Sequence, residues 1–157
     1  MPARTALLVA LLCSQSITAR AELTIQEHAR RFLAIYSDLT ERRDVDVADL
    51  YRPTAKVRVS YFNGETLIQS TLLTGEAWKD SLRRGWFNNT NRLDAAQFEN
   101  VRVVPAGPSQ IAIFATRISQ EKCYLDTGYA VRISPQAANV YRIIQERISI
   151  QMAAVCQ

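Results

Sequence analysis

Apolar and polar positions follow a helical period in the first part of the chain. Between residues 24 and 43, apolar side chains recur every three or four positions, which places them on one face of an amphipathic helix. Thr24 and Glu27 have the spacing of a capping box at its start, and Arg42 and Arg43 suit the negative end of its dipole. The apolar stripe consists of Ile25, Ala29, Phe32, Leu33, Tyr36 and Leu39.

A short second helix is predicted directly after the first. Asp44 and Asp46 are both able to cap its start, because each carboxylate can accept a hydrogen bond from an exposed backbone amide. Pro53 prevents this helix from continuing much beyond Tyr51.

From residue 56 onward the pattern changes to the alternation of a half-buried strand. Asn63-Gly64 is a tight-turn dipeptide between strand patterns at residues 56–61 and 66–73, which predicts a hairpin. A third helix is expected over residues 74–86. Three helices and about six strands joined by short turns indicate the α+β class, with helices on one face of an antiparallel sheet. The remaining strands are predicted at residues 98–104, 111–118, 123–133 and 140–152.

The first 21 residues have the three regions of a secretory signal peptide. Arg4 supplies the positive start, residues 6–13 form a short apolar core, and Ala19-Arg-Ala21 is a small-x-small cleavage site. Cleavage after Ala21 leaves Glu22 as the mature start, so residues 22–157 form a single exported domain. The apolar run is too short to span a bilayer, and no membrane anchor is expected after cleavage. The alternative is an N-terminal helix that belongs to the fold.

Removal of the leader lowers the charge and changes the set of cysteines. The whole chain of 157 residues carries +4; the leader takes two arginines and no acidic residue with it, which leaves +2. That bias is too weak to predict a nucleic-acid partner. Cys13 also leaves, and Cys123 and Cys156 remain as an expected disulfide worth about 3–4 kcal/mol. Two unpaired thiols are the alternative.

No metal site or cofactor is predicted. His28 is the single histidine, and the chain has no Cys-x-x-Cys motif or phosphate-binding glycine loop. Serine hydrolysis would require His28 as its base, and no nucleophile-elbow motif surrounds any serine. A surface position at the start of the first helix is the expected role for this residue.

The order of elements resembles the nuclear-transport-factor-2-like superfamily, which includes SnoaL-like proteins and ketosteroid isomerases. The resemblance implies a curved sheet wrapped around the long first helix as a cone, with a pocket at the open end. It covers nearly all of the mature chain and is one of pattern, without a diagnostic motif. The segments that carry it are residues 32–36, 44–46, 48–51, 55–59, 74–86 and 141–147.

The resemblance also implies catalytic positions, which this chain fills only in part. Tyr36 matches the helix-one tyrosine that donates to an oxyanion in ketosteroid isomerases. The catalytic carboxylate of that family falls near Val59 or Ser60 here, and neither side chain can take a proton from carbon. A pocket enzyme of the cyclase, dehydratase or isomerase type would therefore use Tyr36 with Asp126 or Glu146.

Charged residues of the last two strands offer one further arrangement. Asp126 and Glu146 can meet Arg132 and Arg147 inside the cone if their strands pair. An ordinary cross-strand ion pair or solvent-facing charge is the alternative.

A set of aromatic residues is the candidate ligand pocket, with plain core packing as the alternative. The first functional hypothesis is an exported, non-catalytic domain that binds a small apolar ligand or a protein partner. The second is the pocket enzyme, and the third is a homodimeric assembly module that pairs through an exposed apolar sheet face. The candidate pocket residues are Phe32, Tyr36, Tyr51, Trp78, Trp86 and Tyr129, with Arg58 or Glu146 to orient the ligand.

Overall fold

The computed structural model describes residues 25–88, 94–137 and 140–152. The predicted leader, its cleavage site at Ala21 and Glu22, and Cys156 lie outside these residues. The first helix occupies residues 25–41, followed by the short 3-10 helix η1 (Val45–Leu50) and, later, α2 (Gly75–Asn88). No helix in the described ranges has the length and apolar character needed to cross a membrane.

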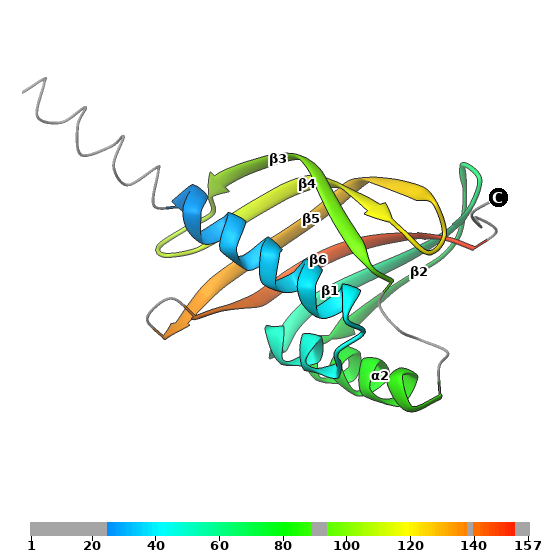
Figure 1. The fold of residues 1–157 in the computed structure, drawn as a ribbon, viewed down its shortest axis with the longest axis horizontal. Helices are drawn as coiled ribbons and strands as arrows, with labels where there is room; N and C mark the ends of the chain where they lie inside the picture. The colour runs from blue at the N-terminus through cyan, green and yellow to red at the C-terminus, as the bar shows by residue number, and fades with distance from the viewer. Residues whose placement is uncertain (1–24, 89–93, 138–139, 153–157) are drawn as a thin grey trace, which may run out of the picture.

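Six strands form one mixed sheet in the order β2-β1-β6-β5-β4-β3, as Figure 1 shows. The expected number of strands is confirmed. The antiparallel expectation holds for every neighbouring pair except β1 and β6, which run parallel. A parallel pair needs a long crossover, which the chain between these two strands supplies. The strands are β1 (Tyr51–Asn63), β2 (Thr66–Thr74), β3 (Ala96–Pro105), β4 (Ile111–Ser119), β5 (Tyr124–Ala137) and β6 (Val140–Gln151).

The helix ends follow the local sequence signals. The first helix ends in a Schellman motif: the Asp44 amide donates to Leu39 O at 2.8 Å and the Arg43 amide donates to Thr40 O at 3.1 Å. Arg43 takes the left-handed position of this motif, with a φ of 56°. Asp44, one of the two predicted candidates, caps η1 by accepting from the Asp46 amide at 2.9 Å.

The start of α2 lies directly against β1. Thr74 Oγ1 accepts from the Ala77 amide at 3.2 Å and so caps this helix. A Cβ at Gly75 would lie 1.9 Å from the Arg52 carbonyl oxygen, so only glycine permits this close approach. The contact holds α2 near the end of the sheet that carries η1.

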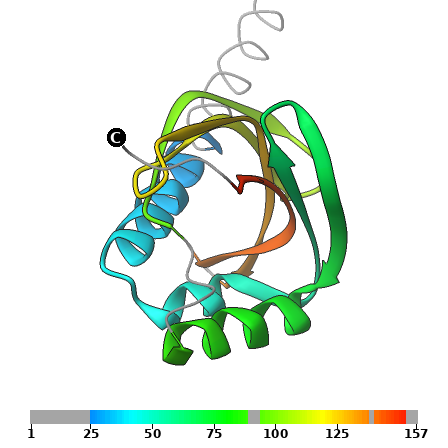
Figure 2. The same ribbon diagram turned by 90° about the vertical axis from the view of Figure 1, so that its right-hand side faces the viewer.

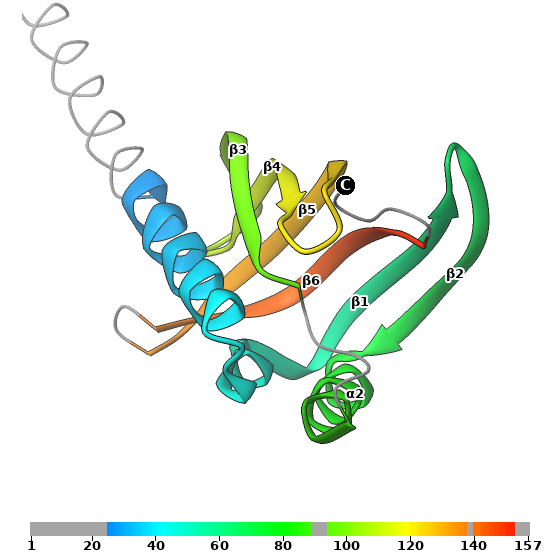
Figure 3. The ribbon, with the colours of Figure 1, turned by 45° about the vertical axis from the view of Figure 1, so that its right-hand side comes forward.

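The sheet has an inner face, which contacts the first helix, and an outer face, which points away from it. Figures 2 and 3 show the sheet curving around the helix, as the predicted cone requires. Alternation along each strand divides its side chains between the two faces. Val57 and Val59 are buried on the inner face, while Arg58 between them is exposed on the outer face. The core lies between the helix and the inner face.

Candidate functional site: a buried carboxylate among tyrosines

Glu146 is a carboxylate at the centre of the inner face. It lies on β6 and is 1% exposed. The Tyr51 hydroxyl donates to its Oε2 at 2.6 Å, and the Tyr129 hydroxyl donates to its Oε1 at 2.8 Å. These tyrosines lie on β1 and β5, the two strands that flank β6. Each carboxylate oxygen therefore has a donor from a different neighbouring strand.

Tyr36 brings a third hydroxyl to this cluster from the first helix. Its side chain is fully buried, and its ring packs edge-on against Phe98 of β3, with centroids 5.7 Å apart. Phe98 in turn packs on Tyr129 at 5.0 Å. The Tyr36 hydroxyl makes no hydrogen bond of ordinary geometry within the described part of the chain, although Tyr51 and Glu146 lie near enough to affect its pKa. It is therefore able to donate to, or accept from, a further group.

Arg117 places a positive charge inside the cone. It lies on β4 and is 2% exposed, and its Nη1 donates to the Tyr124 hydroxyl at 3.4 Å. Its Nε–H finds no partner among the described residues. A guanidinium remains protonated at any ordinary pH, so Arg117 offers a fixed charge and an unused donor.

Burial changes the proton affinities of the cluster. It raises the pKa of Glu146, and the hydrogen bonds from Tyr51 and Tyr129 oppose this rise only in part. Burial, and then the charge of Glu146, raises the pKa of Tyr36, Tyr51 and Tyr129. The tyrosines therefore stay protonated as donors, and Glu146 is shifted toward the range in which a carboxyl group can exchange protons.

Trp78 of α2 adds an unpaired donor at the edge of the cluster. Its indole packs edge-on against Tyr51 with centroids 6.4 Å apart. The buried indole Nε1 lacks a partner among the residues described. Most buried polar groups in proteins are paired, so an acceptor atom is expected near each of the unused donors of Tyr36, Trp78 and Arg117.

Asp126 is buried but has a structural role. Its Oδ1 accepts from the Gly128 amide at 3.0 Å, and its Oδ2 accepts from the Ser149 amide at 2.7 Å. The pairing of β5 with β6 begins only at Ala130 opposite Arg147. The Asp126 carboxylate therefore replaces a ladder hydrogen bond where the two strands separate. Of the two predicted carboxylates, Glu146 is the one beside Tyr36.

Three predicted arginine positions lie outside the cone. Arg58, Arg132 and Arg147 are exposed on the outer face, because their strand neighbours occupy the inner one. They form no ion pair with Asp126 or Glu146 among the described residues, so the solvent-facing alternative describes Arg132 and Arg147.

The remaining predicted residues have different environments. Phe32 is buried in the core, and its ring lies 6.4 Å from that of Tyr36. His28 is half-buried rather than on the open surface, with its ring 5.0 Å from that of Tyr141. The side chain of Trp86 lies outside the described part of the structure. Among the described residues, no three His, Cys, Asp or Glu side chains gather as metal ligands do.

Arg117 is the site residue that sequence reasoning missed. It lies in the strand predicted at residues 111–118, where its charge was assigned no role. Arg117 has the same parity as Ile113 and Ala115, which are buried on the inner face. A cation at an inner position of a central strand is the signal that identifies it.

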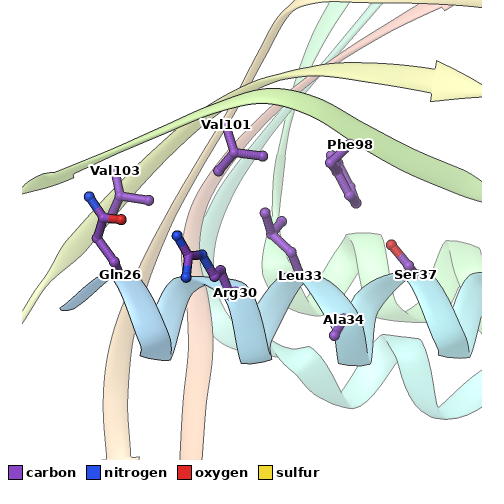
Figure 4. A pocket seen from close by; sticks show the side chains of 8 residues that line it. All are labelled: Gln26, Arg30, Leu33, Ala34, Ser37, Phe98, Val101 and Val103. Atoms are coloured by element: carbon purple, nitrogen blue, oxygen red, sulfur yellow. The ribbon is translucent and has the colours of Figure 1, made fainter. Parts of the chain in front are cut away.

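Two hollows lie near this cluster. One of about 510 Å³ opens at the end of the sheet beside η1, and Tyr51, Arg52, Lys79 and Arg142 are among its lining residues. The other, of about 340 Å³, is a groove between the first helix and β3. Figure 4 shows Arg30 and Leu33 facing Val101 and Phe98 across this groove. Tyr51 lines the first of these hollows and also donates a hydrogen bond to Glu146.

No protein-family model matches the chain, and no curated protein matches its sequence. Solved structures do resemble it. A putative scytalone dehydratase from Novosphingobium aromaticivorans has 10% identity and a TM-score of 0.58, covering 82% of this chain and 85% of that one. ActVI-ORFA from Streptomyces coelicolor has 10% identity and a TM-score of 0.54, covering 80% and 96%.

A third similar structure is a nuclear-transport-factor-2-like protein of unknown function from Pseudomonas putida. It has 13% identity and a TM-score of 0.53, and the match covers 83% of this chain and 87% of that one. At such identities the likeness concerns the fold alone. Together with the helix-lined curved sheet, it identifies the chain as one with the nuclear-transport-factor-2-like fold.

Proposed function

We propose that the inner face of the cone binds a small, mainly apolar molecule through an oxygen atom. The observation that carries this proposal is the set of buried, unused donors on Tyr36, Trp78 and Arg117. A buried polar group without a partner costs about 1–3 kcal/mol. A ligand oxygen that accepts from one or more of these donors removes that cost, whereas an apolar filler does not.

The walls around these donors favour a flat apolar molecule. A series of ring contacts crosses the core, from Phe32 to Tyr36, from Tyr36 to Phe98 and from Phe98 to Tyr129. Aromatic walls with a few placed polar groups are typical of small-molecule sites. The hollow that Tyr51 shares with solvent is the approach we propose for the ligand.

A matched pair of probes tests the need for an oxygen acceptor. Acetophenone carries a carbonyl next to an aromatic ring, and ethylbenzene has nearly the same shape without it. We expect acetophenone to bind about tenfold more tightly, as a buried hydrogen bond predicts, when both are titrated calorimetrically. Tyr36→Phe is expected to reduce this preference, while Arg58→Ala, on the outer face, leaves it unchanged. Equal binding of the two probes contradicts the proposal.

A second candidate function is proton transfer on the bound molecule. Glu146 is a buried carboxyl group with a raised pKa, the property expected of a general acid or base. It would take a proton from a carbon beside the ligand carbonyl. Tyr36 or Arg117 would stabilise the negative oxygen that forms. The likeness to a putative scytalone dehydratase is consistent with chemistry of this class.

Hydrogen–deuterium exchange separates the two candidates. In heavy water, a proton-transferring site exchanges the methyl hydrogens of acetophenone for deuterium, which nuclear magnetic resonance follows directly. We expect Glu146→Gln to slow any such exchange about 100-fold while acetophenone still binds. Equal exchange by the wild type and Glu146→Gln rules out catalysis by Glu146 and leaves the binding proposal intact.

We also propose that the protein is exported and that Cys123 pairs with Cys156 after removal of the leader. Native mass spectrometry of material from an exporting host tests both, together with the oligomeric state. The expected mass is that of a chain beginning at Glu22, less the two hydrogen atoms lost when the disulfide forms. A mass that begins at Met1, or that of two free thiols, contradicts the corresponding part.

A further inference from the structure

The outer face of the sheet carries a concentration of positive charge. One row of residues, each paired with the next on the neighbouring strand, crosses the sheet from β1 to β3. In order, the row contains Arg58, Arg147, Ala130, Phe114 and Arg102. We call the outward cations of this row and the next the cationic face. Neither row contains an acidic residue; Glu99 lies one position further on, opposite Thr116. The cationic face consists of Lys56, Arg58, Arg102, Arg132 and Arg147.

These cations differ from several others on the molecule, which are paired with acidic side chains. Arg31, Arg42 and Arg83 each lie within ion-pair distance of an acidic side chain. No member of the cationic face forms such a pair within residues 25–88, 94–137 and 140–152. The outer face therefore has guanidinium groups whose charge the described part of the chain leaves uncompensated.

Two of these side chains are held in place rather than extended into solvent. Arg147 Nε donates to the Gly128 carbonyl at 2.8 Å. The Arg102 guanidinium lies over the Phe114 ring, 4.4 Å from its centroid. Fixed arginines lose less conformational entropy when they bind a partner.

A hollow lies between the two rows of the cationic face. Its volume is about 190 Å³. Ala112, Phe114 and Ala130 give it apolar walls, while Arg132 and Arg147 stand at its margin. Its apolar lining suits a hydrocarbon side chain, and its charged margin suits carboxylates on either side.

We propose that the cationic face binds an acidic segment of a protein partner, with an apolar side chain in the hollow and flanking carboxylates on Arg132 and Arg147. A second copy of this chain is a poor occupant, because a two-fold axis through the face would set cations against cations. A phosphate polymer would satisfy the charges but has no side chain for the hollow. This inference concerns the opposite face of the sheet from the proposed ligand site and does not rest on it.

The test uses three labelled peptides and fluorescence anisotropy at low and at physiological salt. The first alternates glutamate with leucine, the second replaces leucine by serine, and the third replaces glutamate by glutamine. We expect the first to bind most tightly, the serine peptide about tenfold more weakly and the glutamine peptide not at all. Arg132→Glu with Arg147→Glu is expected to weaken the first peptide at least tenfold, and Arg84→Glu, on exposed α2, less than twofold.

Several results overturn the proposal. One is equal binding of the leucine and serine peptides, which would mean that charge alone accounts for binding and that the hollow takes no side chain. Another is tighter binding of an oligothymidine or of phosphatidylserine vesicles than of the first peptide. A third is unchanged affinity in the doubly substituted protein while circular dichroism shows that it remains folded. Dimers in sedimentation experiments that dissociate on the Arg132 and Arg147 substitutions would assign the face to a second copy instead.

Discussion

The two faces of this sheet are built from the same strands but handle charge in opposite ways. On the inner face, the hydroxyls of Tyr51 and Tyr129 bind Glu146. Arg117 is also buried there, away from solvent. On the outer face, Arg147, the next residue after Glu146, is exposed and has no acidic partner within the described ranges. Neighbours in the sequence therefore belong to two different surfaces.

The difference has an energetic origin. A charge inside a protein loses its hydration and must be compensated by hydrogen bonds or by an opposite charge. A charge on the surface keeps its water, and pairing it contributes little. Inner polar residues should therefore be strongly coupled to folding, while outer ones should be free to serve binding.

The largest effect is expected from Glu146→Ala. It leaves the Tyr51 and Tyr129 hydroxyls without their acceptor and Arg117 without a nearby negative charge. We expect the free energy of unfolding to fall by about 3–5 kcal/mol. Arg132→Ala, on the outer face, is the matched control and should change stability by less than about 0.5 kcal/mol. Urea unfolding measures both, and similar losses for the two would show that the faces do not differ as described.

A conservative change at the same position tests the charge of Glu146. Its pKa is raised in the folded protein above the ordinary value of 4.5, so the folded state holds the proton more tightly than the unfolded state. Stability from this group is fully present below pH 4.5 and is lost as the pH rises through the folded pKa, by up to about 1.4 kcal/mol per pH unit.

Glu146→Gln removes this loss because glutamine does not titrate. We therefore expect the stability of the wild type relative to Glu146→Gln to fall as the pH is raised from 4.5, in thermal unfolding scans at matched ionic strength. A difference that is constant with pH, or that grows in favour of the wild type, contradicts a raised pKa. Arg147→Gln should leave the pH dependence of the wild type in place.

Substitution of two inner-face tyrosines compares the contribution to stability of a hydrogen-bonded hydroxyl with that of a hydroxyl that makes no such bond. Tyr129→Phe removes a donor to Glu146 and should cost about 1–3 kcal/mol, because it leaves a buried acceptor without its partner. Tyr36→Phe removes a buried hydroxyl that has no partner in the described structure and should be neutral or stabilising by about 1 kcal/mol. Thermal unfolding at neutral pH compares them. Equal losses would mean that the Tyr36 hydroxyl is paired in solution.

The fold was predictable because periodicity carries most of it. The Asp44 cap, the Asn63-Gly64 turn and the strand alternation depend on local sequence, and the structure has them where they were predicted. The parallel pairing of β1 with β6 was not predictable in the same way, because strand order depends on contacts between distant segments. β5 also continues to Ala137, beyond the predicted end of its strand at residue 133.

The candidate site was only partly predictable, for the same reason. Tyr36 and Glu146 came from the resemblance and from the residue types, but nothing local distinguishes Glu146 from Asp126. Only the tertiary structure shows that Asp126 is used by the backbone amides of Gly128 and Ser149. The placement of Arg58 in the pocket failed because the period of two fixes which strand residues share a face but not which face is inner.

The smallest effect is expected from an acidic residue placed on the outer face. Ala130 lies directly opposite Arg147 in the pairing of β5 with β6, and it lines the outer hollow. Ala130→Glu creates a cross-strand pair and should stabilise the protein by about 0.2–1 kcal/mol at low salt, with the gain lost at about 1 M salt. The same substitution fills the hollow and neutralises one cation, so the glutamate–leucine peptide should no longer bind.

Ala130→Gln, which has the same size without the charge, should give no salt-dependent gain. A loss of stability with Ala130→Glu that Ala130→Gln shares would mean that the hollow has no room for a side chain, and an acidic partner could not use it as proposed.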